Sequence, residues 1–281
     1  MKLKVSSELA YQFYSPGTLI LNIHALKTSF QQISEEYFFV EPYFFYEELT
    51  SVSADNRFVR VNITEPSALK LRYTATVDNA FLLLDPEDLY EVQVRDMDAL
   101  VLSYLNPSRY CQSDKLYRLA NNMFGHIENA FDKVLALTEW IYNNVEYLSG
   151  STNSQTSAYD TVTEQAGVCR DFAHLGIALC RALTIPARYF TGYSYKLSPP
   201  DFHACFEAYL GGKWIIFDPT RLAPLNGLAK IATGRDAADT AIASIFGDVR
   251  FDAISVSCEL ADEEFQAHDY SQKKAKALSY L

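Results

Sequence analysis

The chain has 281 residues, of which 49% are hydrophobic and 14% aromatic, and it carries a formal net charge of −11 at pH 7. This apolar content excludes a disordered chain, and the length is enough for two domains or one large one. The negative charge argues against a partner that is a nucleic acid or an anionic membrane. No apolar run reaches the roughly 18 residues of a transmembrane helix.

The N-terminal sequence and the cysteines indicate a cytoplasmic protein. Residues 1–7 lead into alternating polar and apolar residues, without the continuous apolar segment of a signal peptide. The five cysteines are scattered, with no C-x-x-C pair, so neither a disulfide scaffold nor a zinc ribbon is predicted. A calcium loop of the EF-hand type is also missing from the sequence. We expect a reduced protein without cofactor or metal, and the sequence leaves its oligomeric state open.

Residues 1–100 are predicted to form an antiparallel β-sandwich, because strand-length segments alternate with turn signals such as Pro16-Gly17. Residues 37–46 are unusually aromatic. We expect them to form sheet core and a domain interface, with a ligand-binding aromatic patch as the alternative. A carbohydrate- or protein-binding role stays open for this domain. The predicted strands are residues 5–14, 18–25, 57–63 and 69–77.

Residues 101–281 are predicted to form a second domain, in which helices precede strands. Helices are expected at 114–123 and 131–145, the second of them capped by Asp132. The polar tail from about residue 261 is expected to fray. The order β, α, β is typical of an α+β protein with two domains.

The segment Gly167-Val168-Cys169 places a cysteine at the start of a predicted helix. Apolar residues recur behind it at helical spacing: Phe172, Leu175, Leu179 and Leu183. In the first turn of a helix, unpaired N–H groups and the macrodipole favour an anion. Such an environment makes a thiol a nucleophile, although a lone cysteine is as often a small buried apolar residue.

Residues 202–218 are predicted to form a β-hairpin around Gly211-Gly212. Alternation along the first strand puts His203, Cys205, Glu207 and Tyr209 on one face. A two-residue loop sets the register so that Asp218 lies opposite Cys205. Asp218 is then the diagonal neighbour of His203, roughly 7–8 Å away at the backbone and within reach of its side chain.

Cys169, His203 and Asp218 together provide the three parts of an activated thiol. The cysteine is the nucleophile, the histidine takes its proton, and the carboxylate fixes the tautomer of the imidazole. The backbone amide of Cys169 is a candidate donor to the oxyanion. The sequence does not assign a second donor.

Other interpretations of these residues are structural. His203 can be a hydrogen-bonded sheet histidine, and Asp218 can be a turn residue at a strand end. Cys205 beside His203 suggests a metal pair, but no further ligand has metal-like spacing, so no metal site is predicted. Glu207 either supports His203 or is exposed, and His174 is expected to be structural.

Residues 167–193, GVCRDFAHLGIALCRALTIPARYFTGY, resemble the bacterial transglutaminase-like superfamily. Four shorter segments do so as well: 105–111, 203–209, 214–220 and 234–239. The resemblance implies a papain-like α+β core that follows an N-terminal β domain. It also implies a Cys-His-Asp triad, carried here by Cys169, His203 and Asp218. Cys205 departs from the family, which usually has an aromatic residue at this position.

The expected function is cysteine-dependent acyl transfer on a peptide or carboxamide bond of a peptide or protein substrate, through a thioester intermediate. Hydrolysis by a cysteine protease or amidase is favoured over cross-linking, because water is always available whereas an amine needs a second pocket. A protein-glutamine transglutaminase and a non-catalytic scaffold that binds peptides or proteins are the alternatives.

Overall fold

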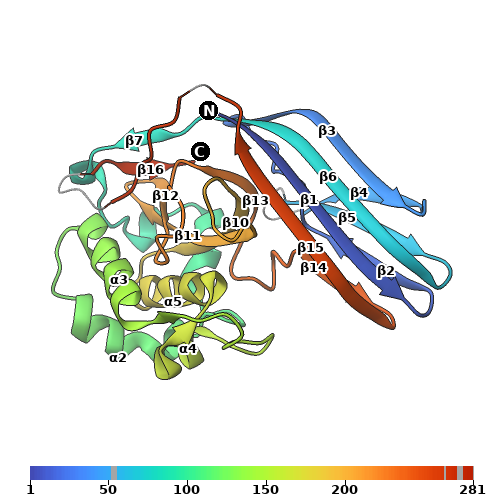
Figure 1. Cartoon of the computed structure of the whole chain (residues 1–281). Helices are drawn as coiled ribbons and strands as arrows, with labels where there is room; N and C mark the ends of the chain where they lie inside the picture. The colour runs from blue at the N-terminus through green and yellow to red at the C-terminus, as the bar shows by residue number, and fades with distance from the viewer. Residues whose placement is uncertain (52–55, 263, 271–274, 281) are drawn as a thin grey trace.

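The computed structural model describes residues 1–51, 56–262, 264–270 and 275–280 (Figure 1). Long strands form a β-sandwich on one side, and a helix-and-sheet core lies beside it. This arrangement confirms the predicted α+β class. No helix in the described part of the chain is long and apolar enough to cross a membrane.

Eight strands form the sandwich. They are β1 (Lys2–Phe13), β2 (Gly17–Leu21), β3 (Gln31–Glu41), β4 (Tyr46–Thr50), β5 (Arg57–Ile63), β6 (Ser67–Asn79), β14 (Ala243–Phe246) and β15 (Val249–Leu260). One antiparallel sheet has the order β15-β1-β6-β3, and the other has the order β14-β2-β5-β4. In β1, alternate residues from Leu3 to Phe13 are buried, as expected for a strand with one face on a core.

Two of these strands come from the far end of the chain. β14 pairs with β2, and β15 pairs with β1 from Leu3↔Leu260 to Phe13↔Val249. The sandwich is therefore not confined to residues 1–100. Residues 243–260, which the sequence-based division assigned to the second domain, are part of it. Pairing between segments so distant in the chain leaves no local signal in the sequence.

The aromatic stretch 37–46 is buried on one side only. Phe44 is 7% exposed, whereas Tyr37 and Phe39 are each 57% exposed and Tyr43 is 75% exposed. The prediction of sheet core and domain interface is therefore wrong for these exposed residues. Tyr37 and Phe39 share the outer face of β3, because alternate side chains of a strand point to the same face, and Tyr43 lies in the connection between β3 and β4.

In the described chain, helices, one four-stranded sheet and two two-stranded sheets make up the core. Its strands are β7 (Leu82–Leu84), β8 (Glu146–Tyr147), β9 (Ala166–Gly167), β10 (Ala187–Ser194), β11 (Phe202–Leu210), β12 (Lys213–Phe217), β13 (Leu228–Gly234) and β16 (Ala277–Ser279). Its α-helices are α1 (Ala99–Leu102), α2 (Ser113–Phe124), α3 (Ala130–Asn144), α4 (Ala158–Glu164) and α5 (Cys169–Ala182). The expected cap of α3 is wrong, because Asn129 Oδ1 accepts the Asp132 N–H at 2.9 Å and Asn129 is the cap.

The buried helix α5 packs against the sheet β12-β11-β10-β13 (Figure 1). Gly176 faces the sheet at the point of contact. A Cβ atom there would lie 2.5 Å from Cε1 of the buried Phe206 ring. Glycine at this position therefore lets α5 lie close enough to β11 to bring the helix start beside the first residues of that strand.

The end of the described chain returns to the core. β16 pairs with β7, and Leu278 is fully buried. Tyr280 Oη donates a hydrogen bond to Leu225 O at 2.7 Å. The predicted fraying of the tail is therefore wrong for residues 275–280, whose apolar side chains fill a small cluster with Phe190.

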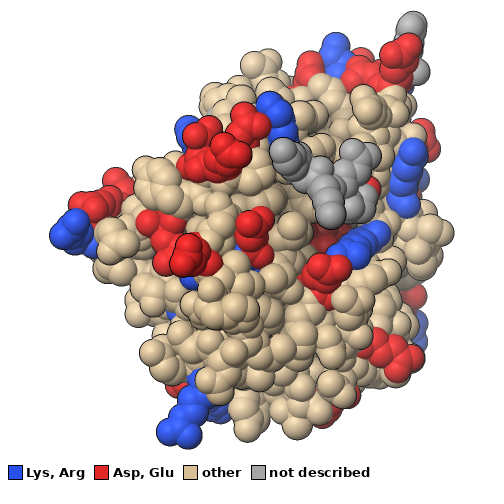
Figure 2. Space-filling model, turned by 90° about the vertical axis from the view of Figure 1, so that its left-hand side faces the viewer, with Lys and Arg blue, Asp and Glu red and all other residues tan. Residues whose placement is uncertain are grey.

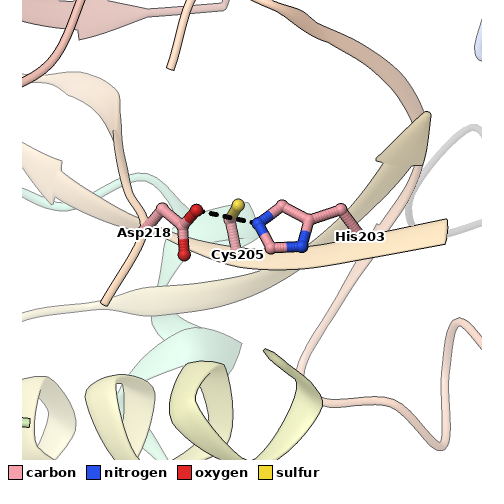
Figure 3. A group of neighbouring side chains, drawn as sticks. All are labelled: His203, Cys205 and Asp218. Atoms are coloured by element: carbon pink, nitrogen blue, oxygen red, sulfur yellow. Dashed lines mark hydrogen bonds and ion pairs between the residues drawn. The ribbon is translucent and has the colours of Figure 1, made fainter. Parts of the chain in front are cut away.

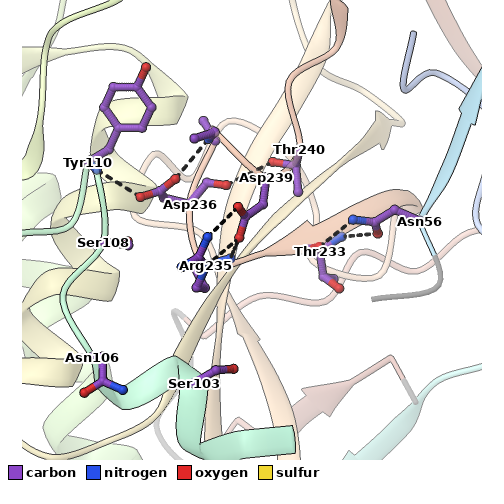
Figure 4. Close-up of polar contacts among 12 residues, drawn as sticks. Asn56, Ser103, Asn106, Ser108, Tyr110, Thr233, Arg235, Asp236, Asp239 and Thr240 are labelled. Atoms are coloured by element: carbon purple, nitrogen blue, oxygen red, sulfur yellow. Dashed lines mark hydrogen bonds and ion pairs between the residues drawn. The ribbon is translucent and has the colours of Figure 1, made fainter. Parts of the chain in front are cut away.

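The turn after β13 is fixed to the connector that precedes α2 (Figure 4). Tyr110 N–H donates to Asp236 Oδ2 at 2.9 Å. Arg181, on α5, donates to Asn106 O at 3.0 Å and to Arg235 O at 2.6 Å. One buried guanidinium thus holds the connector, the turn and the end of α5 together.

Amide side chains from the sandwich hydrogen-bond to β13, the outer strand of the core sheet. Asn56 Nδ2 donates to Thr233 O at 2.8 Å, and Asn56 Oδ1 accepts the Thr233 N–H at 3.0 Å (Figure 4). Gln31 makes the same pair of bonds to the backbone of Lys230, both at 2.7 Å. Asn79 Nδ2 donates to Leu228 O at 2.6 Å. These side chains bind backbone groups on the side of β13 where the sheet has no further strand.

Glu207 is fully buried between two cations. Its Oε2 accepts from Arg188 Nε at 2.5 Å, and its Oε1 accepts from Lys230 Nζ at 2.9 Å. Burial alone would raise the pKa of Glu207, but the charges of Arg188 and Lys230 outweigh it and the pKa is lowered. Both sequence-based interpretations of Glu207 are wrong, since it is neither exposed nor bonded to His203.

Replacing Glu207 by glutamine is expected to lower the free energy of unfolding by about 3–5 kcal/mol, because two buried cations lose their counter-charge. Urea denaturation measures this loss. Since the folded-state pKa is lowered from 4.5, the contribution is fully present above that unfolded-state value and is lost as the pH falls through the folded-state pKa.

The matched control is Glu47→Gln, which removes the half-exposed partner of Arg60 at 2.5 Å. This change is expected to cost less than about 1 kcal/mol. Equal losses for the two variants would show that the Glu207 cluster does not support the fold as described.

Candidate active site

Cys169 is the first residue of α5 and is half-buried. The amides of Asp171 and Phe172 donate to Val168 O at 2.9 and 3.1 Å, so the hydrogen-bond ladder of the helix begins after the cysteine. The Asp171 carboxylate also accepts the Val168 N–H at 3.0 Å. The Cys169 amide therefore lies at the positive end of the helix, outside its ladder.

The hairpin that carries the histidine and the aspartate has the predicted register. β11 pairs with β12 from Phe206↔Phe217 to Leu210↔Lys213. Gly211 and Gly212 adopt φ angles of +55° and +78°, as a tight hairpin loop requires. A side chain at Gly211 would also meet Asp88 O at 2.5 Å. The register was predicted from the loop length alone and is confirmed.

His203 and Asp218 form a buried hydrogen-bonded pair across this hairpin (Figure 3). His203 Nε2 lies 2.8 Å from Asp218 Oδ2, and the two residues are 1% and 6% exposed. Asp218 Oδ1 accepts the N–H and the hydroxyl of Thr220 at 2.9 and 2.7 Å. Both oxygens of the carboxylate are therefore held, so it fixes the plane of the imidazole.

The pKa of His203 is set by two opposing effects. Burial alone would lower it, but the negative charge of Asp218 and the nearby thiols of Cys205 and Cys169 outweigh burial and raise the pKa well above 6.5. Nδ1 of His203 is buried and has no hydrogen-bond partner among the described residues. The imidazole therefore holds a proton readily and has one nitrogen left for proton transfer.

The Cys169 thiol influences the pKa of four described side chains, which therefore lie within its electrostatic range. They are His203, Cys205, Tyr147 and Tyr189. The structure thus brings together Cys169, His203 and Asp218, the three residues that sequence reasoning selected, from a helix start, a strand start and a strand end.

Tyr147 was missed by the sequence reasoning. It lies on β8, which pairs in parallel with β9 directly before Cys169, and its ring centroid is 5.8 Å from that of Phe172. Burial raises the pKa of its hydroxyl to about 12, and the Cys169 thiol and backbone amide also act on it. A strand of two residues has no periodicity, so only the connection to residue 167 could have indicated its place.

His174 has the structural role that was expected. Its Nε2 accepts the Ala237 N–H at 3.1 Å, and its ring is stacked on Tyr110 with 5.0 Å between centroids. Burial holds the pKa of His174 well below 6.5. A neutral imidazole in this position fastens the turn after β13 to α5.

A cavity of about 350 Å³ reaches Asp218 from the side of the C-terminal segment. Its lining includes Leu135, Lys196, Asp218, Arg221, Leu225 and Tyr270. The nearby ligand-type atoms of His203, Cys205 and Asp218 all lie within 4.8 Å of one another. Within the part of the chain that the structure describes, these three residues are therefore the group that could hold a metal ion in this region.

Comparison with known proteins matches both parts of the fold. Residues 1–100 match the family "Bacterial transglutaminase, N-terminal domain", and residues 117–219 match the "Transglutaminase-like superfamily". The crystal structure of a candidate cysteine protease from Cytophaga hutchinsonii superposes with a TM-score of 0.97 at 58% identity. The superposition covers 100% of this chain and 98% of that one.

The curated relatives are uncharacterised proteins, and each match covers only part of them. An uncharacterised protein of Mycobacterium leprae is 32% identical over 117 residues, which are 38% of this chain and 42% of the relative. The uncharacterised protein YebA of Bacillus subtilis is 25% identical over 175 residues, 53% of this chain and 23% of the relative. This chain thus matches less than half the length of these relatives.

The fold and these matches define a protein with a transglutaminase-like core. The chain belongs to the bacterial transglutaminase-like superfamily, with the N-terminal domain of that family in front of the core.

Replacing Asp218 by asparagine is expected to lower the pKa of His203, because the attraction of the carboxylate is lost while burial remains. NMR titration of the imidazole resonances measures the shift, and His174 in the same spectra is the internal control. Since the wild-type pKa is raised, the pair stabilises the fold below pH 6.5, and this contribution is lost as the pH rises through the folded-state value. An unchanged His203 titration would contradict the pairing.

Proposed function

We propose that this protein is a cysteine-dependent hydrolase of peptide or carboxamide bonds that works through a thioester. The observation that carries the proposal is the buried His203–Asp218 pair beside a cysteine at the start of a helix. The similarity to a candidate cysteine protease over the whole chain supports the same chemistry.

Acylation of Cys169 needs a base, a donor to the oxyanion and an acid. His203 Nδ1 takes the thiol proton while Asp218 holds Nε2. The sulfur attacks the carbonyl carbon, and the oxyanion receives hydrogen bonds from the Cys169 amide and, we infer, from the Tyr147 hydroxyl. The C–N bond then breaks, and the proton on Nδ1 passes to the departing amine. The product is a thioester on Cys169 and a free amine.

Deacylation runs the same steps with a new nucleophile. His203 Nδ1 takes a proton from water, whose oxygen attacks the thioester, and returns that proton to the Cys169 sulfur as the acid product leaves. A primary amine in place of water would make the protein a transglutaminase. Hydrolysis is favoured, because a cross-linking enzyme must bind a second substrate against water.

A peptide or protein fits the surface better than a nucleic acid does. On the face shown in Figure 2, acidic and basic side chains are scattered and do not gather into a basic field. The net charge of −11 would repel phosphates. A scaffold that only binds peptides would not need a buried histidine held in one orientation by a carboxylate.

Incubation of the protein with a library of glutamine-containing peptides, with and without a primary amine, tests the proposal. Intact-mass and peptide mass spectrometry are expected to show an acyl group on Cys169 and hydrolysed peptides, with little amine incorporated. Cys169→Ala is expected to abolish both signals, whereas Cys258→Ala, which removes a half-buried thiol on β15, is expected to keep them. Dominant amine incorporation would establish the transglutaminase, and no acylation at all would favour the scaffold.

Tyr147→Phe tests the second oxyanion donor. Loss of one such donor is expected to reduce kcat by about 10²–10³-fold with little change in KM, because the interaction forms in the transition state. Tyr142→Phe is the control, since Tyr142 is 44% exposed on α3 and its ring contact with Arg221 does not need the hydroxyl. Equal rates for Tyr147→Phe and wild type would exclude Tyr147 from the oxyanion site.

A further inference from the structure

We propose that His203, Cys205 and Asp218 form a binding site for a thiophilic divalent cation such as Zn²⁺, and that the bound ion blocks the chemistry of Cys169. The binding step stands on geometry alone, whereas the inhibitory effect rests on the proposed function. Cys205 has no part in the acyl-transfer steps, yet its side chain lies beside the pair that those steps require (Figure 3).

The three side chains offer the mixed donor set that zinc prefers. One imidazole nitrogen, one sulfur and one carboxylate oxygen all lie within 4.8 Å of one another. Bonds of about 2.0–2.3 Å to a tetrahedral ion would place such ligands roughly 3.3–3.8 Å apart, so small side-chain rotations suffice. Deprotonated Cys205 and Asp218 supply two negative charges, which match a divalent cation.

The surroundings already orient these ligands. Asp218 Oδ1 is held by the N–H and hydroxyl of Thr220, which leaves Oδ2 to face His203 Nε2. Groups that orient ligands in this way strengthen metal sites. Cys205 is fully buried on β11, so its sulfur keeps one position relative to His203.

The cavity of about 350 Å³ reaches Asp218, one of the three ligands, and provides space for water on the carboxylate side of the site. Its lining contains the acidic Asp218 and Asp269 as well as the basic Lys196 and Arg221. The formal charges of the lining therefore balance, and a cation meets no net repulsion. A water molecule in the cavity can complete a four-coordinate ion, as in zinc sites with three protein ligands.

Binding of the ion changes what His203 can do. Starting from the imidazolium form, the metal replaces the proton on Nε2 and the proton on the Cys205 sulfur, so two protons are released. The imidazole keeps only the proton on Nδ1. Giving that proton to a leaving amine would create an imidazolate, and Nδ1 has no lone pair left to take the thiol proton. The metal-bound protein therefore lacks both its acid and its base.

The test is metal binding to Cys169→Ala, in which the catalytic thiol cannot contribute a ligand. Titration with Zn²⁺ in a calorimeter is expected to show one site, and Cd²⁺ is expected to give the ultraviolet charge-transfer band of a thiolate ligand. Adding Cys205→Ala to this variant is expected to weaken the affinity at least about 100-fold and remove the band. Adding Cys258→Ala instead is the matched control and is expected to change neither.

Two further variants keep the test decisive if the replacement of Cys205 by alanine prevents folding. Cys205→Ser keeps the size of the side chain and is expected to weaken Cd²⁺ binding, and Asp218→Asn is expected to weaken Zn²⁺ binding. Failure of Cys169→Ala to bind either metal, or unchanged affinity when Cys205 is replaced, would overturn the site. Because these measurements need no activity, an inactive wild-type protein would count against the proposed function alone. If the wild-type protein is active, Zn²⁺ is expected to inhibit it at concentrations near the measured Kd. The same Zn²⁺ concentrations are expected not to inhibit a variant in which Cys205 is replaced.

Discussion

The hydrogen bond between His203 and Asp218 is the interaction on which the candidate site depends. It exists because a two-residue loop fixes the register of β11 against β12, and a shift by one residue would turn the histidine to the other face of the sheet. The pair is almost fully buried, so it is shielded from competing water and from salt. Thr220 holds the far oxygen of the carboxylate and prevents it from rotating away. The orientation of the imidazole is therefore set by backbone geometry before any substrate arrives.

The thiol reaches this pair through a second constraint, which is the close packing of α5 on β11. Gly176 and Phe206 meet at the contact, where no larger residue than glycine fits without displacing the ring. The start of the helix is anchored separately, because β9 pairs with β8 immediately before Cys169. Packing in the middle of the helix and pairing at its start together place the sulfur beside the histidine.

The parts of the site that the sequence predicts are those that depend on short-range geometry. Helical spacing after Cys169 and the hairpin loop after Leu210 are local, and both were predicted with the correct residues. Tyr147 and the ionic contacts of Glu207 depend on segments that meet only in the folded chain, and neither was predicted. Cys205 is a different case. Alternation put it on the His203 face and the loop length put Asp218 opposite it, so the group His203, Cys205 and Asp218 followed from the sequence, but it lacks metal-like spacing along the chain and was overlooked.

The sandwich has a structural task in addition to any binding role. β13 is the outer strand of the core sheet, and such a strand has backbone groups on one side that no neighbouring strand binds; if they were exposed, they would invite pairing with another chain. Gln31, Asn56 and Asn79 bind those groups from the sandwich, and two strands from the end of the chain lie within the sandwich sheets. The core sheet that carries His203 is thus completed by side chains from the other domain. The two parts of the chain are therefore joined by hydrogen bonds between side chains and backbone, and the sandwich covers the outer strand of the sheet that carries His203.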